Sequence, residues 1–170
     1  MSNSKNIDIY KHYCRYSFQE EENIKYLADN MLGRLSRFMR IMGYDTMYPN
    51  LEVADSEIIE MCRNESRILV SRDRQICLRY IDSIRINSDI IQDQIVQICS
   101  YEKPTKENLF TRCTACNGVL IPGNCNCKEE FDPRKADKVS HCPDCGKCYW
   151  PGTHSEGIVK FLSDLGVFNK

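Results

Sequence analysis

Three aspartates with the chemistry of metal ligands stand at points where a helical pattern begins. Asp29 follows the apolar segment 24–28, Asp73 follows the apolar segment 67–72, and Asp55 opens an amphipathic run. In a parallel α/β sheet the carboxyl ends of the strands share one edge, and ligands bind in the crevice beside it. Carboxylates that meet there repel one another, and a hard cation such as Mg²⁺ or Mn²⁺ relieves the repulsion. The pattern predicts metal-assisted hydrolysis, with a phosphodiester as the favoured substrate.

Each of these acids also has a purely structural explanation. Asp is among the best helix N-cap residues, because its carboxylate accepts bonds from free backbone N–H groups and stabilises by about 1 kcal/mol. Asp29 and Asp73 directly precede helical patterns, and either Asp55 or Ser56 could cap the helix between them. Metal binding and helix capping are therefore both compatible with these residue types.

The elements that position the acids alternate between strand and helix. Buried strands are expected at 24–28, 45–48, 67–71 and 84–87. Helices are expected at 31–42, 55–64, 74–80 and from 88 or 89 through 98. Strands that alternate with helices are joined by right-handed crossovers, so the sequence predicts an α/β fold with a compact parallel sheet flanked by helices.

Four segments are expected along the chain. Residues 1–23 form an N-terminal extension with a weak structural signal, 24–100 the α/β domain, and 101–111 a linker. In 112–170 cysteine, glycine, proline and asparagine replace the apolar periodicity, until a final helix is expected at 155–165. Thr153 and Glu156 fit the capping box of that helix.

Two C-x₂-C pairs, Cys113 with Cys116 and Cys142 with Cys145, predict a zinc ribbon. Their separation of 25 residues is slightly longer than usual, and an enlarged hairpin can absorb it. Two such turns complete a closed tetrahedral Cys₄ site, which leaves no open position and is therefore structural. Zinc bound in this way can contribute on the order of 10 kcal/mol to folding.

The composition and the eleven cysteines are those expected of a globular, metal-binding protein. Hydrophobic residues make up 42% and charged residues 28%, as in soluble globular proteins. Without a signal peptide or a membrane-spanning run, we expect a cytoplasmic protein, in which an odd number of cysteines favours metal binding over disulfides. Cys125, Cys127 and Cys148 are either spare thiols, or Cys125 and Cys127 form a second metal site with Cys148 or His141.

The net charge of −1 provides no strong field for nucleic acid. If RNA is the substrate, a local cluster of basic side chains must attract it. The candidates are Arg34, Arg37 and Arg40, which recur at i, i+3 and i+6 of one helix. The alternative is a solvated helix face. Trp150 and His154 could stack on an unpaired base, or Trp150 could pack between the ribbon and the last helix.

The chain resembles the PIN-like RNase domains that carry a C-terminal zinc ribbon, a family named after the C-terminal region of a nematode mutator-class exonuclease. The resemblance covers roughly residues 24–165. Its segments are 27–46 (LADNMLGRLSRFMRIMGYDT), 55–59 (DSEII), 69–73 (LVSRD), 112–117 (RCTACN), 142–146 (CPDCG) and 149–154 (YWPGTH).

The resemblance implies hydrolysis of RNA with Mg²⁺ or Mn²⁺ bound by Asp29, Asp55 and Asp73. Many members add a fourth acid from a helical arm that this chain lacks; Asp89 either substitutes for it or caps a helix. Relatives often have two adjacent acids where this chain has Ala54 before Asp55, which implies a sparser metal site.

The resulting hypothesis is a metal-dependent endoribonuclease. Arg37, Arg40 and Arg72 are expected to contact phosphates, and Ser71 to steady the turn at Asp73. One alternative is a non-catalytic RNA-binding protein whose aspartates only cap helices. Another is a protein-interaction component of a toxin–antitoxin or RNA-processing assembly.

Overall fold

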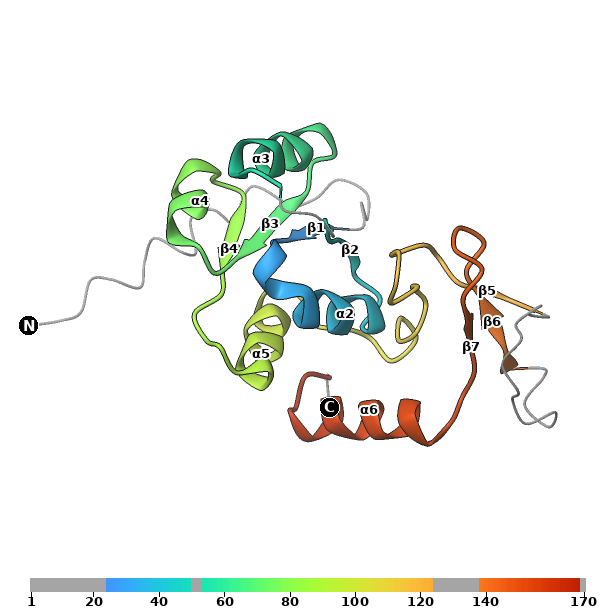
Figure 1. The fold of residues 1–170 in the computed structure, drawn as a ribbon. Helices are drawn as coiled ribbons and strands as arrows, with labels where there is room; N and C mark the ends of the chain where they lie inside the picture. The colour runs from blue at the N-terminus through green and yellow to red at the C-terminus, as the bar shows by residue number, and fades with distance from the viewer. Residues whose placement is uncertain (1–23, 50–52, 124–137, 169–170) are drawn as a thin grey trace, which may run out of the picture.

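The computed structural model describes residues 24–49, 53–123 and 138–168. The predicted extension 1–23 and the cysteines at 125 and 127 lie outside these residues. Four parallel strands form one sheet in the order β2-β1-β3-β4 (Figure 1). The strands are β1 Lys25–Ala28, β2 Asp45–Met47, β3 Ile68–Ser71 and β4 Ser83–Arg85. The predicted parallel sheet is therefore confirmed.

Helices cover both faces of this sheet. They are the 3₁₀ helix η2 Asn30–Leu32 and the α-helices α2 Gly33–Ile41, α3 Asp55–Asn64, α4 Arg74–Arg79 and α5 Ile91–Tyr101. In Figure 1, α3 and α4 lie above the sheet, and α2 and α5 lie below it. Strands buried on both faces read as nearly continuous apolar runs, which is the pattern that the sequence displays.

Alternation along β1 divides its side chains between two apolar cores. Tyr26 and Ala28 belong to the core between the sheet and helices α2 and α5, whereas Leu27 belongs to the core between the sheet and helices α3 and α4. β3 alternates in the same way, because successive strand residues point to opposite faces. The carboxyl ends of β1 and β3 are thereby held side by side, with Ala28 opposite Val70.

Gly43 ends α2 and allows the segment after α5 to pack against it. Its φ of +91° is in the left-handed region, and a Cβ there would lie 2.4 Å from the carbonyl oxygen of Asn108. Phe110 donates its backbone N–H to the carbonyl of Ile41 at 2.8 Å. The segment expected to be a linker is thus packed on the end of α2.

A small antiparallel sheet follows, in the order β5-β6-β7. Its strands are β5 Ile121–Pro122, β6 Ser140–His141 and β7 Cys148–Tyr149, and the last helix is α6 Thr153–Asp164. α6 returns to the α/β domain, where Leu162 is fully buried in the core beneath α2 and α5. The ring centroids of Phe161 and Phe38 are 5.6 Å apart.

The start of α6 differs from the expectation. The helix begins at Thr153 rather than at Ser155, and Ser155 accepts a hydrogen bond from the N–H of Gly152 at 2.9 Å. The predicted capping box of Thr153 and Glu156 is therefore wrong, because the N-cap residue is Gly152 and Thr153 is already the first residue of the helix. None of the helices in the described part of the chain is both long and apolar enough to cross a membrane.

Candidate functional site

Asp29 lies at the carboxyl end of β1 and is held from three sides. Its backbone N–H donates to the carbonyl of Val70 at 2.9 Å, which fixes it against β3. Its Oδ1 accepts from the N–H of Asn30 at 2.6 Å, and its Oδ2 accepts from the hydroxyl of Ser71, also at 2.6 Å. Only 9% of the residue is exposed. Asp29 is thus both the cap of η2 and an acceptor for a hydroxyl on the neighbouring strand.

Ser71 connects Asp29 with Asp73 at this edge of the sheet. The Ser71 hydroxyl donates to Asp29 and accepts from the N–H of Asp73 at 3.0 Å. Asp73 is exposed, and its Oδ1 caps α4 by accepting from the N–H of Gln75 at 2.6 Å. Since a carboxylate has room for about four hydrogen bonds or ligands, Asp73 keeps acceptor capacity that the cap does not use.

Asp55 has a different environment. It is the first residue of α3, where Ala54 is the N-cap residue and no side chain caps the helix. Its Oδ2 forms an ion pair with Arg79 at 3.0 Å, and its side chain is 46% exposed. Arg79 ends the helix that Asp73 begins, so Asp55 and Asp73 engage opposite ends of α4.

The three carboxylates are not drawn around one point in this arrangement. Among the residues that the structure describes, one group of three or more potential ligands has all its donor atoms within 4.8 Å, and it consists of cysteines. The hard oxygen donors suit Mg²⁺ or Mn²⁺ by their chemistry. To join Asp29 and Asp73 around one ion, Asp55 would have to share its carboxylate between Arg79 and the ion, or leave Arg79.

The donor atoms that lie within 4.8 Å of one another are the sulfurs of the four cysteines predicted to hold zinc: Cys113, Cys116, Cys142 and Cys145. The closest sulfur pairs are 3.4 and 3.5 Å apart, close to the distance of about 3.8 Å expected around a tetrahedral zinc ion. Backbone N–H groups of residues 117 and 146 donate to the carbonyls of Cys113 and Cys142 at 2.9 Å, which closes the two turns. The donor set fits a metal such as zinc.

Tyr149 supports the first of these turns. Its hydroxyl lies 3.0 Å from the sulfur of Cys113 and accepts from the N–H of Thr114 at 3.1 Å. Burial by itself raises the pKa of Cys113. Hydrogen bonds from Tyr149 and from the N–H groups of Cys116 and Ala115 outweigh that effect and lower it to about 6. The thiolate form that metals bind is thereby favoured for Cys113, whereas burial raises the pKa of Cys116 to about 12.

Arg40, expected at a phosphate, is buried at the junction with the zinc ribbon. Only 4% of the residue is exposed. Its guanidinium donates to the carbonyls of Thr46 at 2.8 Å, Thr114 at 3.1 Å and Ala115 at 3.0 Å. These bonds connect α2 to the first cysteine turn and leave Arg40 unable to bind RNA. It is therefore removed from the proposed phosphate contacts.

A second junction, which the sequence did not reveal, forms around Asp45 of β2. Its Oδ1 accepts from Arg67 at 2.7 Å and from the side chain of Asn117 at 2.8 Å, and Arg112 lies 3.4 Å from its Oδ2. Burial raises the pKa of Asp45, but the bonds from Arg67 and Asn117 outweigh it and hold the pKa below its usual value. The signal in the sequence was an Asn directly after the C-x₂-C pair, a residue type that tolerates the left-handed backbone; the structure gives Asn117 a φ of +74°.

The remaining predicted contacts are dispersed. Arg37 is exposed on α2, while Arg72 forms an ion pair with Asp89. Asp89 does not cap α5, since no side chain caps that helix; the hydroxyl of Ser88 instead accepts from the N–H of Ile90.

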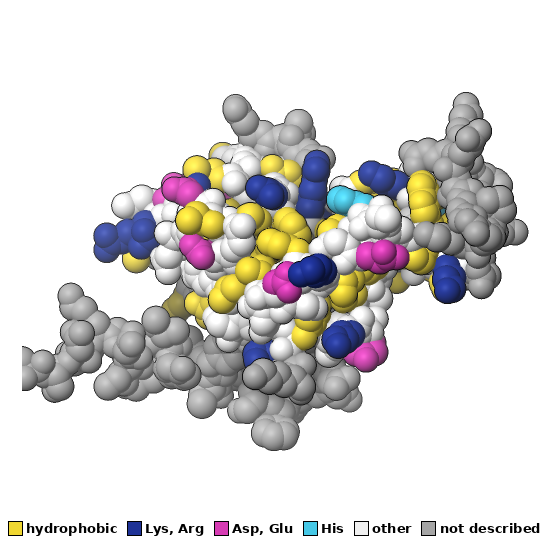
Figure 2. Space-filling view, turned by 90° about the horizontal axis from the view of Figure 1, so that it is seen from below, with side chains coloured by type: hydrophobic (Ala, Val, Ile, Leu, Met, Phe, Trp, Pro, Cys, Tyr) yellow, Lys and Arg dark blue, Asp and Glu magenta, His cyan; other side chains and the backbone are white. Residues whose placement is uncertain are grey.

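The two aromatic candidates lie away from Asp73. Trp150 is half-buried after β7, and His154 is exposed at the start of α6. Figure 1 places these segments at the opposite side of the molecule from α4. On the face in Figure 2, Lys and Arg alternate with Asp and Glu and do not gather in one patch.

Cys148 departs from the expectation of a spare thiol. It is buried in β7 and is disulfide-bonded. Cys62 and Cys99 are buried and free, and burial raises the pKa of Cys62 to about 11 and that of Cys99 to about 12. These two behave as small apolar side chains.

A parallel sheet with acidic residues at its carboxyl edge, followed by a four-cysteine ribbon, defines an α/β domain with an appended metal-binding module. Residues 24–162 match the family model described as the Mut7-C RNAse domain. The chain therefore belongs to the Mut7-C RNase domain family, as the sequence resemblance indicated. A search of curated proteins found no match.

Proposed function

We propose that this chain is a metal-dependent ribonuclease that hydrolyses RNA phosphodiester bonds within the strand. Membership in an RNase domain family supports RNA as the substrate. The single observation that carries the site is the Ser71 hydroxyl, which joins Asp29 and Asp73 at the carboxyl edge of β1 and β3. A cytoplasmic location and a structural zinc ion in the ribbon are part of this proposal.

Asp29, Asp55 and Asp73 are the proposed ligands of Mg²⁺ or Mn²⁺. When bound, such an ion lowers the pKa of a water molecule and offsets charge on the phosphate. Ser71 keeps Asp29 oriented by donating to it. Arg37 and Arg72 are the remaining candidates for flanking phosphates. The product is expected to carry a 5′-phosphate.

A test should separate metal binding from helix capping. Asn caps a helix about as well as Asp and lacks the ligand charge. Asp73→Asn should therefore retain the parent's melting temperature, whereas Asp29→Asn also loses the acceptor of the Ser71 hydroxyl and should melt at a lower temperature. Both should lose RNA cleavage in Mn²⁺ by about 100-fold or more, since even residues that only support metal ligands cost 10–100-fold. The exposed Asp164→Asn variant on α6 is the matched control and should cleave like the parent.

The second candidate function is a non-catalytic RNA-binding protein. It is favoured by the two observed caps and by the ion pair that holds Asp55. That function predicts RNA affinity without turnover and equal behaviour of all three Asn variants. Cleavage by Asp29→Asn and Asp73→Asn at the parental rate would reject the metal assignment in its favour.

A further inference from the structure

A pocket of about 480 Å³ lies between α3 and α4, at the edge of the sheet where β3 and β4 begin. Its volume is in the range of about 300–1,000 Å³ that is typical of small-molecule sites. Asp29 and Asp73 lie at the opposite edge, where β1 and β3 end. The pocket is thus separate from these two acids, and it reaches the third proposed ligand, Asp55, through Arg79. The residues that line it are Arg63, Ser66, Arg67, Ile68, Leu78, Arg79, Tyr80, Ile81 and Asp82.

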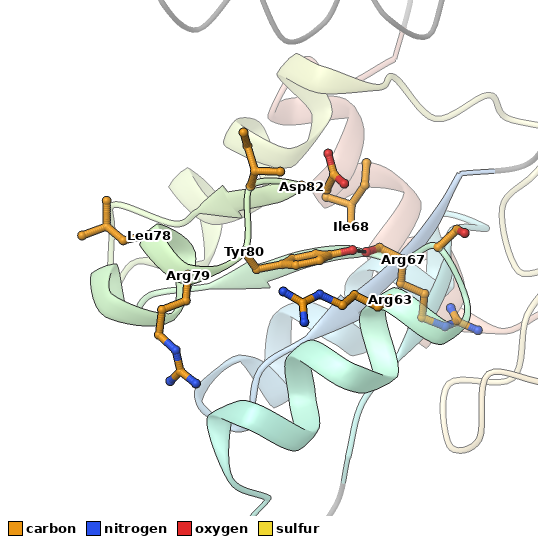
Figure 3. Close-up of a pocket in the computed structure, with 9 residues that line it drawn as sticks. Arg63, Arg67, Ile68, Leu78, Arg79, Tyr80 and Asp82 are labelled. Atoms are coloured by element: carbon orange, nitrogen blue, oxygen red, sulfur yellow. Dashed lines mark hydrogen bonds between the residues drawn. The ribbon is translucent and has the colours of Figure 1, made fainter.

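Two of its three arginines have capacity for an anion. Arg67 is saturated, because it donates to Asp45, to Glu65 and to the carbonyl of Tyr26. In the described part of the chain Arg63 has no side-chain partner, and Arg79 has only its exposed ion pair with Asp55. Figure 3 shows Arg63 reaching from α3 toward Tyr80, with Arg79 extending from the end of α4 on the same side.

Apolar side chains form another part of the wall. Leu78 and Ile81 are 69% and 71% exposed. Tyr80 is buried, and its hydroxyl donates to the carbonyl of Arg67. Large exposed apolar side chains beside a pocket are a feature of binding surfaces. Guanidinium groups bind phosphate, an apolar wall accepts the face of a base, and the carboxylate of Asp82 can accept from a ribose hydroxyl.

We propose that this pocket binds one unpaired nucleotide of a single-stranded RNA substrate, next to the cleavage site; the proposal rests on the ribonuclease function. Arg79 is the connection, because the same guanidinium lines the pocket and bonds Asp55 at 3.0 Å. A phosphate that binds Arg79 would compete with Asp55 and release this carboxylate for a metal ion. Binding of the flanking nucleotide would thus prepare the site for cleavage.

The test uses the zinc-loaded full chain and a labelled single-stranded RNA of about twelve nucleotides, within the range that such proteins cover. No Mg²⁺ or Mn²⁺ is added, so that affinity is measured by fluorescence anisotropy without cleavage. Arg63→Gln combined with Ile81→Ser should weaken binding by about five-fold or more. The slope of log affinity against log salt should fall by about 0.7 for the lost phosphate contact. Lys160→Gln combined with Val96→Ser, a matched pair on α6 and α5, should change neither.

If the double variant Arg63→Gln with Ile81→Ser bound RNA with the affinity and salt dependence of the parent, the proposed nucleotide pocket would be rejected. An amide NMR titration with adenosine monophosphate in which the shifted signals lie outside residues 63–68 and 78–82 would also reject it. RNA cleavage in Mn²⁺ is measured separately. If the parent cleaves RNA and the pocket variant binds RNA like the parent, the nucleotide pocket is rejected and the ribonuclease function is retained. If the pocket variant loses affinity but the parent does not cleave RNA, the ribonuclease function is rejected.

Discussion

The α/β domain and the zinc ribbon obtain their stability in different ways. The sheet is enclosed by two clusters of buried apolar side chains, one on each face. In the described part of the ribbon, the buried side chains are those of Cys113, Val139, Cys142 and Cys148. With so little apolar area buried in its described part, the ribbon would take much of its folding free energy from a metal bound by the four cysteines.

The junction between the two regions is polar, unlike the interior of the α/β domain. Arg40 donates to the carbonyls of Thr114 and Ala115, and Asp45 binds the side chain of Asn117. These partners belong to the first cysteine turn, whose shape a metal bound by the four cysteines would maintain. We therefore expect the position of the ribbon on the α/β domain to be coupled to metal binding.

The largest expected effect is that of removing the metal. Chelation, or Cys142→Ser, should unfold the ribbon, because the bound ion contributes on the order of 10 kcal/mol to such modules. Hydrogen exchange should show lost protection at 112–120 and 139–149 and retained protection in β1 and β3. If protection were lost everywhere together, the two regions would form one cooperative unit and the comparison would be wrong.

Arg40→Met tests the junction with a smaller change. Loss of three bonds from a charged, buried donor should lower the free energy of unfolding by about 2–3 kcal/mol in urea titrations. Arg37→Met on the exposed side of the same helix should stay within about 0.5 kcal/mol of the parent. Equal effects of the two substitutions would contradict the distinct roles of these arginines.

Ser71→Ala examines the α/β domain at its proposed site. Removing the hydroxyl leaves Asp29 Oδ2 without its donor and the N–H of Asp73 without its acceptor, which should cost about 1–2 kcal/mol. RNA cleavage should fall about ten-fold, as for other residues that orient metal ligands. Ser71→Thr keeps the hydroxyl and should recover part of the activity, which a purely structural role would not require.

The smallest effect is expected from Arg79→Gln. Exposed ion pairs contribute about 0–1 kcal/mol, so freeing Asp55 should tighten Mn²⁺ binding by no more than about five-fold in the absence of RNA. Calorimetric titration of the zinc-loaded protein measures this. Weaker Mn²⁺ binding in the variant would show that Arg79 does not compete for Asp55.

The same contrast explains what the sequence could predict. Strands and helices of the α/β domain were predicted to within a few residues, because apolar periodicity reports which face of an element is buried. The four cysteines were predicted because two C-x₂-C pairs have few other uses. Contacts between the two regions produce no periodic pattern in the sequence, so the roles of Asp45 and Asn117 were missed.

Arg40 illustrates the limit. Residues spaced by three positions turn by about 60° per step on a helix of 3.6 residues per turn, so Arg40 points about 120° away from Arg34. Arg34 and Arg37 remain exposed while Arg40 faces inward. The sequence also could not tell that Arg79 would bind Asp55, since that partner comes from another helix.

The most direct test of the proposed metal site is anomalous scattering from crystals of the zinc-loaded protein grown with Mn²⁺. We predict a manganese peak bounded by the carboxylates of Asp29, Asp55 and Asp73, with Arg79 turned away from Asp55. No peak at these residues, with Asp55 still bonded to Arg79 at saturating Mn²⁺, would contradict the assignment.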